Sequence, residues 1–310
     1  MDGPSSTGTV IKSVGSQYTV RTDDGRTLLC ALKGKFRLQG MRTTNPVAVG
    51  DRVRVEGADG MTAITEILDR RNYIIRRAAN LSREAHIIAA NIDLAFLVVT
   101  LRLPEIKPPF IDRFLASAES YRIPVCLVFN KMDIYTAEET AQVDAWRRLY
   151  ERIGYEVLTT SVPRRLNIDR MADMMRGRVT MLSGNSGVGK SSLINAIQPD
   201  AALRSGEVSA ATLSGRHTTT HAEMIPVGDG GYIIDTPGVR GFGLVRTERE
   251  EVYHFFPEIF RAAARCRYHN CLHVNEPGCA VKDAVQAGDI AESRYMSYLG
   301  ILEDDGKYRW

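Results

Sequence analysis

The chain has 310 residues, of which 44% are hydrophobic and 25% charged, and it carries a formal net charge of +3. This composition is typical of a folded globular protein, and no apolar run approaches the roughly 18 residues that a membrane-spanning helix needs. The start of the chain has no basic region followed by an apolar stretch. We therefore expect a cytoplasmic protein that is neither secreted nor bound to a membrane.

A chain of this length is expected to form more than one domain, because a single core rarely serves so many residues. We predict three domains, spanning residues 1–78, 79–245 and 246–310. Residues 1–80 hold 13 Lys and Arg against 8 Asp and Glu. This excess favours an anionic partner such as RNA, although an ordinary solvated basic surface would give the same counts.

The first domain contains short alternating runs that are separated by Gly and Asp residues. The runs are "TVIKSVGSQYTVRT", "RTLLCALKG", "VAVGDRVRV" and "MTAITEIL", and "DDG" is typical of a hairpin turn. We predict a small antiparallel β-barrel of the OB type, with an SH3-like barrel as the second choice. Such barrels often bind oligonucleotides, but many only pack against a neighbouring domain.

From about residue 91 the pattern changes to apolar strands separated by helical segments. "DLAFLVVTL", "PVCLVFN", "YEVLTTS", "RVTMLSG" and "GYIIDTPG" are typical of parallel strands buried on both faces. One helical segment, "AEETAQVDAWRRLYERIG", is expected to end at Gly154. We predict an α/β domain that binds its ligand at the carboxyl ends of the strands, followed by a mostly helical region. Cys30 and Cys126 are expected in the core.

"NKMD", Asn130 to Asp133, follows one of these strands and predicts guanine recognition. Asp133 can accept hydrogen bonds from the N1–H and N2 amino groups of guanine, whereas adenine offers no matching pair of donors. This argues against an ATPase or a kinase. We expect Lys131 over the base, Asn130 bracing the phosphate loop, and Thr160 and Ser161 in a second loop around the base.

"GNSGVGKS" follows the strand "RVTML" and precedes the helix "SLINAI", which is the context that a phosphate loop requires. Its glycines allow backbone N–H groups to curl around a phosphate at the positive end of a helix. We expect Lys190 to contact the β- and γ-phosphates and Ser191 to bind Mg²⁺. The predicted nucleotide ligands in this segment are Gly184, Asn185, Ser186, Gly187, Val188, Gly189, Lys190, Ser191 and Ser192.

Two further segments are expected to respond to the γ-phosphate. In "GRHTTTH", Thr219 is our candidate for the Mg²⁺ shell, with Thr218 and Thr220 as alternatives. In "DTPG", Asp235 can hold Mg²⁺ through water and the N–H group of Gly238 can meet the γ-phosphate, although this tetrapeptide alone is also a common turn.

Three of the five cysteines lie close together beside histidines in "CRYHNCLHVNEPGC", which favours a metal site over disulfides. We expect Cys266, Cys271, His273 and Cys279 to be the four ligands of a tetrahedral Zn²⁺. His269 is the alternative fourth ligand. Three buried cysteines without a metal would be the other interpretation.

The order of these motifs is unusual, because ordinary GTP-binding domains carry the phosphate loop first and here Lys190 follows Asn130 by 60 residues. Guanine motif, base loop, phosphate loop, threonine segment, "DTPG" and Cys/His knuckle, in that order, resemble the circularly permuted GTPases of the RsgA/YjeQ family. The resemblance covers essentially the whole chain. It implies an OB barrel, a permuted GTPase domain, a zinc-binding carboxyl-terminal domain, and the cofactors GTP or GDP, Mg²⁺ and one Zn²⁺.

The family also implies hydrolysis of GTP that is stimulated by the small ribosomal subunit, late in the maturation of that subunit. The expected partners are this subunit and its rRNA, no membrane is expected, and the protein is expected to be a monomer released on hydrolysis. The alternative is an RNA-binding module that depends on nucleotide and whose turnover is incidental. We also hypothesise that nucleotide state sets the orientation of the carboxyl-terminal domain through "VRGFGLV".

We also expect one residue to position the attacking water. Val239 follows "DTPG" where Ras-like enzymes carry a glutamine, and a valine cannot orient water. His217, which matches the "HTT" motif of the family, is our candidate, with an exposed loop histidine as the alternative. The predicted catalytic residues are therefore His217, Lys190 and Thr219.

Overall fold

The computed structural model describes residues 5–33, 46–58, 61–77, 85–199, 223–235 and 248–303. They belong to two compact units. Unit 1 comprises Met1–Phe96, Ile168–Ser183 and Gly189–Arg240, and unit 2 comprises Leu97–Asn167, Gly184–Val188 and Gly241–Trp310. Both units contain parts of the predicted central segment, so the three domain boundaries stay a prediction.

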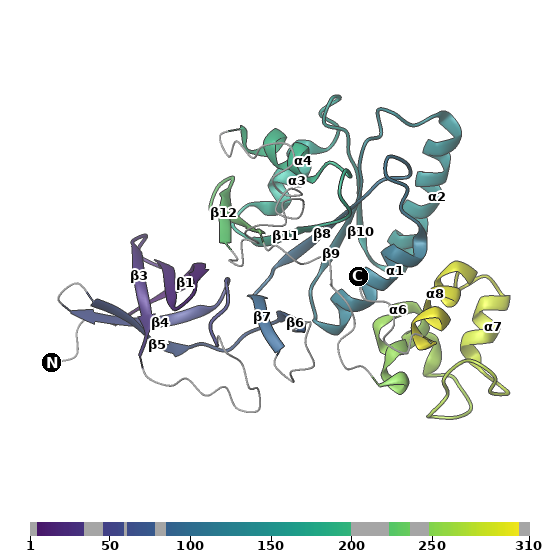
Figure 1. Cartoon of the computed structure of the whole chain (residues 1–310). Coiled ribbons are helices and arrows are strands. Elements are labelled where there is room, and N and C mark those ends of the chain that lie inside the picture. Colours follow the sequence, from purple (N-terminus) through teal and green to yellow (C-terminus); the bar gives the residue numbers. More distant parts are fainter. Residues whose placement is uncertain are drawn as a thin grey trace. The chain divides into compact units, whose positions relative to one another are not determined.

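The first five strands of unit 1 form the barrel seen in purple and blue in Figure 1. They are β1 (Ser5–Val14), β2 (Gln17–Thr22), β3 (Thr27–Leu32), β4 (Arg52–Ala58) and β5 (Met61–Ile67). The order is β1-β2-β3-β5-β4, and β4 pairs back onto β1. Only the β3–β5 pairing is parallel. This closed, five-stranded arrangement confirms the predicted barrel and favours the OB type over the SH3-like alternative.

β1 closes the barrel because it is long enough to pair on both sides. Its residues Ser5–Thr9 pair with β4, and Gly8–Val14 pair with β2 across a register shift. At Gly8 a Cβ atom would come within 2.6 Å of the carbonyl oxygen of Arg21, so a larger residue would separate the strands. The buried core of the barrel consists of Val10, Tyr18, Val20, Cys30, Val47, Val53, Val55 and Ile64.

A two-stranded sheet, β6 (Tyr73–Arg77) and β7 (Ala85–Ala90), follows the barrel in unit 1. Buried polar contacts hold the segments that lead into this sheet and out of it. The guanidinium of Arg70 lies 2.6 Å from the carboxylate of Asp51, and these side chains are 9% and 0% exposed. The side chain of Asn72 both donates to and accepts from the backbone of Ile92 at 2.8 Å. Buried polar groups whose hydrogen bonds are all satisfied favour a single conformation of the chain.

The rest of unit 1 is the α/β part. It contains β11 (Val179–Ser183), β12 (Glu223–Val227), β13 (Gly231–Asp235), α3 (Ile168–Met175) and α4 (Lys190–Ile197). β13 runs parallel to β11 and antiparallel to β12, and β12 pairs with β1 of the barrel at Glu223 and Lys12. α3 and α4 pack against each other. One hydrogen-bonded sheet thus continues from the barrel into the α/β part.

Unit 2 begins with the second half of β8 (Leu94–Val99), followed by β9 (Val125–Phe129) and β10 (Glu156–Thr159). β9 lies between β8 and β10, and every residue of β8 and β9 is buried, as the apolar runs predicted. α1 (Pro108–Ser120) and α2 (Ala137–Ile153) follow β8 and β9, respectively. α2 starts with a capping box between Thr136 and Glu139 and ends at Gly154, whose φ is 123°. Cys126 is buried in β9.

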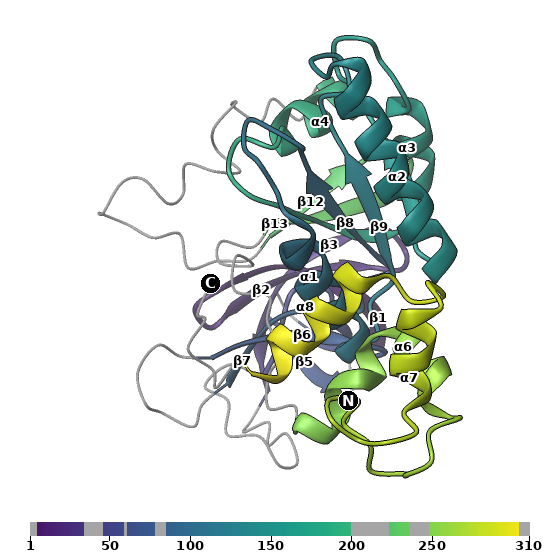
Figure 2. The ribbon, with the colours of Figure 1, turned by 90° about the vertical axis from the view of Figure 1, so that its right-hand side faces the viewer.

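The carboxyl-terminal part of unit 2 is helical, as predicted. It consists of the 3-10 helix η3 (Arg249–Phe255) and the α-helices α6 (Pro257–Ala263), α7 (Ala280–Gln286) and α8 (Glu292–Leu302). α8 packs against α1, and the two helices lie side by side in Figure 2. Within the described residues, none of the helices combines the length and the apolar character that crossing a membrane requires.

A group of buried polar side chains connects α8 to α1, and we call it the Arg294 network. It consists of Asp112, Tyr150, Glu258, Arg294 and Ser297. The guanidinium of Arg294 donates to Glu258 at 2.6 Å and to Asp112 at 2.8 Å. Ser297 and Tyr150 donate their hydroxyls to Asp112 at 2.6 and 2.8 Å. The arginine is 1% exposed, so its charge is compensated almost entirely by these partners.

Candidate nucleotide site and metal centre

The predicted phosphate loop lies between β11 and α4. Gly184 has a φ of 139°, and a Cβ atom there would lie 2.2 Å from the carbonyl oxygen of Val98. Gly187 and Gly189 also have positive φ values, of 85° and 98°. Only glycine adopts such conformations at low cost, so the backbone can curl and direct its N–H groups inward. α4 begins at Lys190, which places a helix amino terminus directly after the loop.

Asn130 joins the guanine motif to the phosphate loop within unit 2. Its side-chain amide donates to the carbonyl oxygen of Val188 at 2.9 Å, across 58 residues of sequence. Its side-chain oxygen Oδ1 accepts from the hydroxyl of Thr160 at 2.9 Å, and its backbone N–H donates to the carbonyl oxygen of Val99 at 2.9 Å. The side chain is 2% exposed. Asn130 therefore links the predicted guanine motif to the predicted phosphate loop.

The base loop and the guanine motif are also in direct contact. The hydroxyl of Ser161 donates to the carboxylate of Asp133 at 2.7 Å, and Thr160 accepts through its carbonyl from the N–H of Met132 at 3.1 Å. Thr160 and Ser161 are both fully buried. The guanidinium of Arg164 donates to the carbonyl oxygen of Asp133 at 3.2 Å. These bonds orient the carboxylate that we expect to read guanine.

Sequence reasoning missed the contact between the guanine motif and the loop after β8. The N–H of Leu101 donates to the hydroxyl of Tyr135 at 2.8 Å, and that hydroxyl donates to the carbonyl of Asn130 at 2.9 Å. The ammonium of Lys131 donates to the carbonyl of Leu103. The only sequence signal for this loop is Pro104, a few residues after an apolar strand.

Several predicted residues lie outside the described part of the chain. These are His217, Thr219 with its alternatives Thr218 and Thr220, and Gly238. Asp235 is the last residue of β13, so it stands at the carboxyl end of that strand as expected. Lys190 and Ser191 are the first two residues of α4, and each is 9% exposed.

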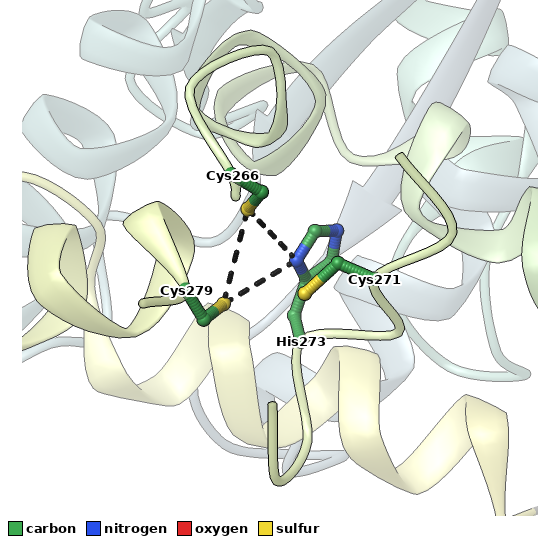
Figure 3. Close-up of side chains that lie close together, drawn as sticks. All are labelled: Cys266, Cys271, His273 and Cys279. Carbon is green, nitrogen blue, oxygen red and sulfur yellow. Dashed lines mark hydrogen bonds between the residues drawn. The ribbon is translucent and has the colours of Figure 1, made fainter. Parts of the chain in front are cut away.

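The four predicted metal ligands come together in the carboxyl-terminal part of unit 2 (Figure 3). The three sulfur atoms and a ring nitrogen of the histidine all lie within 4.8 Å of one another. Nδ1 of His273 is 3.6 Å from the sulfur of Cys266 and 3.5 Å from that of Cys279, and these two sulfurs are 4.0 Å apart. Cys271 completes the group. The alternative ligand His269 is exposed and is not part of this group.

These distances fit a tetrahedral zinc ion. With about 2.3 Å to sulfur and about 2.0 Å to nitrogen, a tetrahedron separates two sulfurs by about 3.8 Å and sulfur from nitrogen by about 3.5 Å. Burial raises the pKa of the Cys271 thiol to about 12 and lowers the pKa of His273. Burial thus favours the neutral imidazole, which is the form that binds metal, while a bound dication would stabilise the thiolates.

The loop that carries His273 is held by its neighbours. The hydroxyls of Tyr295 and Tyr298 on α8 donate to the carbonyls of His273 and Leu272 at 2.6 and 2.7 Å. The carboxylate of Glu276 accepts from the N–H groups of Leu272, Val274 and Asn275. His273 itself has a φ of 61°, a conformation that few residues other than glycine adopt. The surrounding bonds stabilise it in the position that points its ring at the sulfurs.

The fold and the site together define a class. A guanine motif that precedes the phosphate loop in sequence, yet is hydrogen-bonded to it in space, characterises a circularly permuted GTPase. The model of the RsgA GTPase family matches residues 67–245, and the model of the RsgA N-terminal domain matches residues 7–64. The chain therefore belongs to the RsgA GTPase family.

Relatives and solved structures agree with this assignment over nearly the full chain. The small ribosomal subunit biogenesis GTPase RsgA of Phocaeicola vulgatus is 55% identical over 97% of this chain and 98% of its own length. RsgA 2 of Bacteroides thetaiotaomicron is 54% identical with the same coverage. The crystal structure of YjeQ from Thermotoga maritima has a TM-score of 0.80 at 34% identity, covering 99% of this chain and 100% of that one. YloQ, described as a circularly permuted GTPase, has a TM-score of 0.78 at 30% identity, covering 99% and 98%.

Proposed function

We propose that this GTPase acts late in the maturation of the small ribosomal subunit, where it binds rRNA and is released when GTP is hydrolysed to GDP and phosphate. Relatives named small ribosomal subunit biogenesis GTPases align with 97% of the chain. The observation that carries the nucleotide chemistry is the 2.9 Å bond from Asn130 to Val188, which joins guanine motif and phosphate loop despite their reversed order. The basic excess in residues 1–80 suits a polyanionic partner.

The residues that bind GTP are part of this proposal. Asp133 would accept from guanine, Lys131 would cover the base, and the loop around Ser161 would line it. The phosphates would lie on the N–H groups of residues 184–192 and on the ammonium of Lys190. Asp235 and Gly238 would respond to the γ-phosphate. The geometry that supports these roles is the positive φ of the loop glycines and the burial of Asn130, Thr160 and Ser161.

Hydrolysis would proceed by positioning and electrostatic stabilisation, since phosphoryl transfer needs little covalent participation from the protein. Mg²⁺, when bound by Ser191 and Thr219, would neutralise charge that develops between the β- and γ-phosphates. Lys190 would stabilise the same charge. His217 would align the attacking water through its neutral imidazole, in place of the glutamine that Val239 replaces.

The Cys266, Cys271, His273 and Cys279 group would hold one Zn²⁺ per chain in a closed, structural site. Its support is that the distances among the sulfurs of Cys266 and Cys279 and the Nδ1 atom of His273 are close to those of a zinc tetrahedron. We further propose that the protein is cytoplasmic and monomeric. Its nucleotide state would set the orientation of the carboxyl-terminal region through residues 239–245, which lie outside the described residues.

The rate of GTP hydrolysis with and without purified small ribosomal subunits tests the proposal most directly. We expect subunits to raise turnover strongly and Lys190→Ala to remain bound to them, because it cannot complete the cycle. Unstimulated turnover would favour the alternative, an RNA-binding module with incidental hydrolysis. Competition between GTP and ATP tests the selectivity assigned to Asp133, and equal binding would remove that assignment.

A single substitution tests the proposed role of His217 in aligning the attacking water. His217→Ala should lower turnover on subunits and leave GTP affinity nearly intact, because the imidazole is assigned to the water and not to the nucleotide. His269→Ala, which alters an exposed histidine of the knuckle, is the matched control and should hydrolyse at the normal rate. Equal turnover of His217→Ala and the unaltered protein on subunits would contradict the assignment.

A further inference from the structure

The loop after β8, residues 100–106 with the sequence "TLRLPEI", lies against the guanine motif in unit 2, and we call it the β8–α1 loop. The ammonium of Lys131 donates to the carbonyl oxygen of Leu103. The guanidinium of Arg102 donates to the carbonyl oxygen of Ile134. Two side chains, one from each segment, therefore bind the backbone of the other segment.

The hydroxyl of Tyr135 makes a further connection between these segments. It donates to the carbonyl oxygen of Asn130 at 2.9 Å and accepts from the N–H of Leu101 at 2.8 Å. Asn130 is the residue whose side chain braces the phosphate loop. A phenylalanine at position 135 would keep the ring and its packing but leave one donor and one acceptor without their partner.

The β8–α1 loop is also held from within and lies next to the phosphate loop. The hydroxyl of Thr100 donates to the carbonyl of Pro104 at 2.6 Å, and a Cβ atom on Gly187 would lie 3.6 Å from Cδ of Pro104. Leu103 and Lys131 have φ values of 56° and 66°. Such conformations are unfavourable for both residue types, so the surrounding bonds must maintain them. In these conformations, the carbonyl oxygen of Leu103 lies against the ammonium of Lys131.

We propose that the β8–α1 loop is a third element of the guanine-nucleotide site and that Tyr135 is its positioning residue. Tyr135 holds the loop on the guanine motif, the Leu103 carbonyl then holds the Lys131 ammonium, and the alkyl chain of Lys131 is thereby kept over the base. This inference rests on the proposed role of Lys131. Because Lys131 is assigned to the base and not to the γ-phosphate, the loop controls how long the nucleotide stays bound and not how fast it is cleaved.

A double-mutant cycle on the full-length protein tests this inference. Dissociation of a fluorescent GDP analogue is measured for the unaltered protein, Tyr135→Phe, Lys131→Ala and the double variant, together with hydrolysis at saturating GTP. We expect Tyr135→Phe to accelerate dissociation about 5- to 20-fold, as loss of one or two hydrogen bonds would, and to lower turnover at saturating GTP by a much smaller factor. In the Lys131→Ala background, Tyr135→Phe should add less than about two-fold.

Two further variants keep the test independent of folding defects. Thr100→Val removes the bond from Thr100 to Pro104 with little change of volume, and it should accelerate GDP release by a smaller factor than Tyr135→Phe. Tyr268→Phe makes the same chemical change on an exposed tyrosine of the knuckle and should leave GDP release unaltered.

The outcomes separate the inference from the function on which it rests. If Lys131→Ala accelerates GDP release but Tyr135→Phe does not, the positioning role is wrong and the nucleotide site stands. If Tyr135→Phe has the same effect with and without Lys131, or slows hydrolysis as much as it weakens binding, Tyr135 does not act through Lys131. If Lys131→Ala leaves GDP release unchanged, the proposed role of Lys131 fails first.

Discussion

The barrel and the carboxyl-terminal helices are of comparable length but are stabilised differently. In the barrel, backbone pairing closes the ring, and apolar side chains such as Val10, Val53 and Ile64 fill it with no exposed surface. The carboxyl-terminal helices are short, and α6 and α7 have seven residues each. They bury Arg294 and Glu258 and gather four metal-binding side chains. Short helices are marginal by themselves, so side-chain cross-links add to the apolar core around Phe256, Ile259 and Tyr298, whereas backbone pairing closes the barrel.

Loss of metal should distinguish the two regions most strongly. Chelation of the proposed Zn²⁺, or Cys271→Ser, removes a binding energy that reaches about 10–16 kcal/mol in zinc-finger peptides. We expect the backbone amides of α6, α7 and α8 to lose protection from hydrogen exchange while those of the barrel keep theirs. Metal analysis should find one zinc per chain before chelation. If the protein contained no zinc and these helices kept full protection, the stability of the carboxyl-terminal region would not depend on metal.

The second largest effect is expected at the Arg294 network. Arg294→Met leaves Asp112 and Glu258 buried without a cation, which costs about 3–5 kcal/mol. Chemical denaturation followed by probes in α8 measures this loss. Arg147→Met is the matched control, because Arg147 pairs with Asp144 and Glu151 on the exposed face of α2 and such pairs contribute about 0–1 kcal/mol. Equal losses of unfolding free energy in the two variants would show that the buried network contributes no more to stability than the exposed ion pairs do.

The barrel is expected to be destabilised by added side-chain volume at Gly8. Gly8→Ala places a methyl group 2.6 Å from the carbonyl oxygen of Arg21, and such overpacking costs about 1–3 kcal/mol. The unfolding of the barrel, measured by its own amide protection, should shift while that of α8 does not. Gly300→Ala in α8 meets no neighbouring atom and should stabilise the helix by about 0.5–1 kcal/mol. A destabilised barrel in both variants would argue against the steric explanation.

The smallest effect is expected on the stability of the barrel at low pH. Hydrogen bonds from Arg52 and then Thr7 lower the pKa of Asp23 from 3.8 to about 2. Because the folded pKa lies below the unfolded one, this stabilisation is complete above about pH 4 and is lost as the pH falls toward 2. Arg52 and Asp23 are 39% and 51% exposed, so the contribution stays below about 1 kcal/mol. Asp23→Asn should abolish this part of the pH dependence of barrel unfolding, and an unchanged profile would assign it to other carboxylates.

Features encoded within short segments could be predicted from the sequence. Gly154 ends α2 because it is a glycine after a helical pattern, and it does so at a φ of 123°. The apolar runs of β8 and β9 are buried along their whole length. Cys266, Cys271, His273 and Cys279 come together as their clustering in one short stretch suggested. In each case a few adjacent residues carry the signal.

Features that depend on distant partners could not be predicted. Arg294 and Asp112 are 182 residues apart, and each looks like a surface residue of an amphipathic helix until α8 is seen on α1. Tyr135 is an ordinary residue before a helix cap until its hydroxyl is found between Asn130 and Leu101. The strand order of the barrel depends likewise on pairings that no single strand specifies. Only the structure reveals which polar groups satisfy one another.

The Arg294 network has a consequence for how the molecule would survive a broken backbone. α8 is attached to α1 through Asp112, and Arg261 of α6 donates to the carbonyl of Ile153 at 3.2 Å. Neither bond uses the peptide that leads from β13 to η3. A chain cleaved between Asp235 and Glu248 should therefore co-purify as a two-fragment complex. Covalent continuity would be as dispensable at this junction as linear order is for a permuted GTPase.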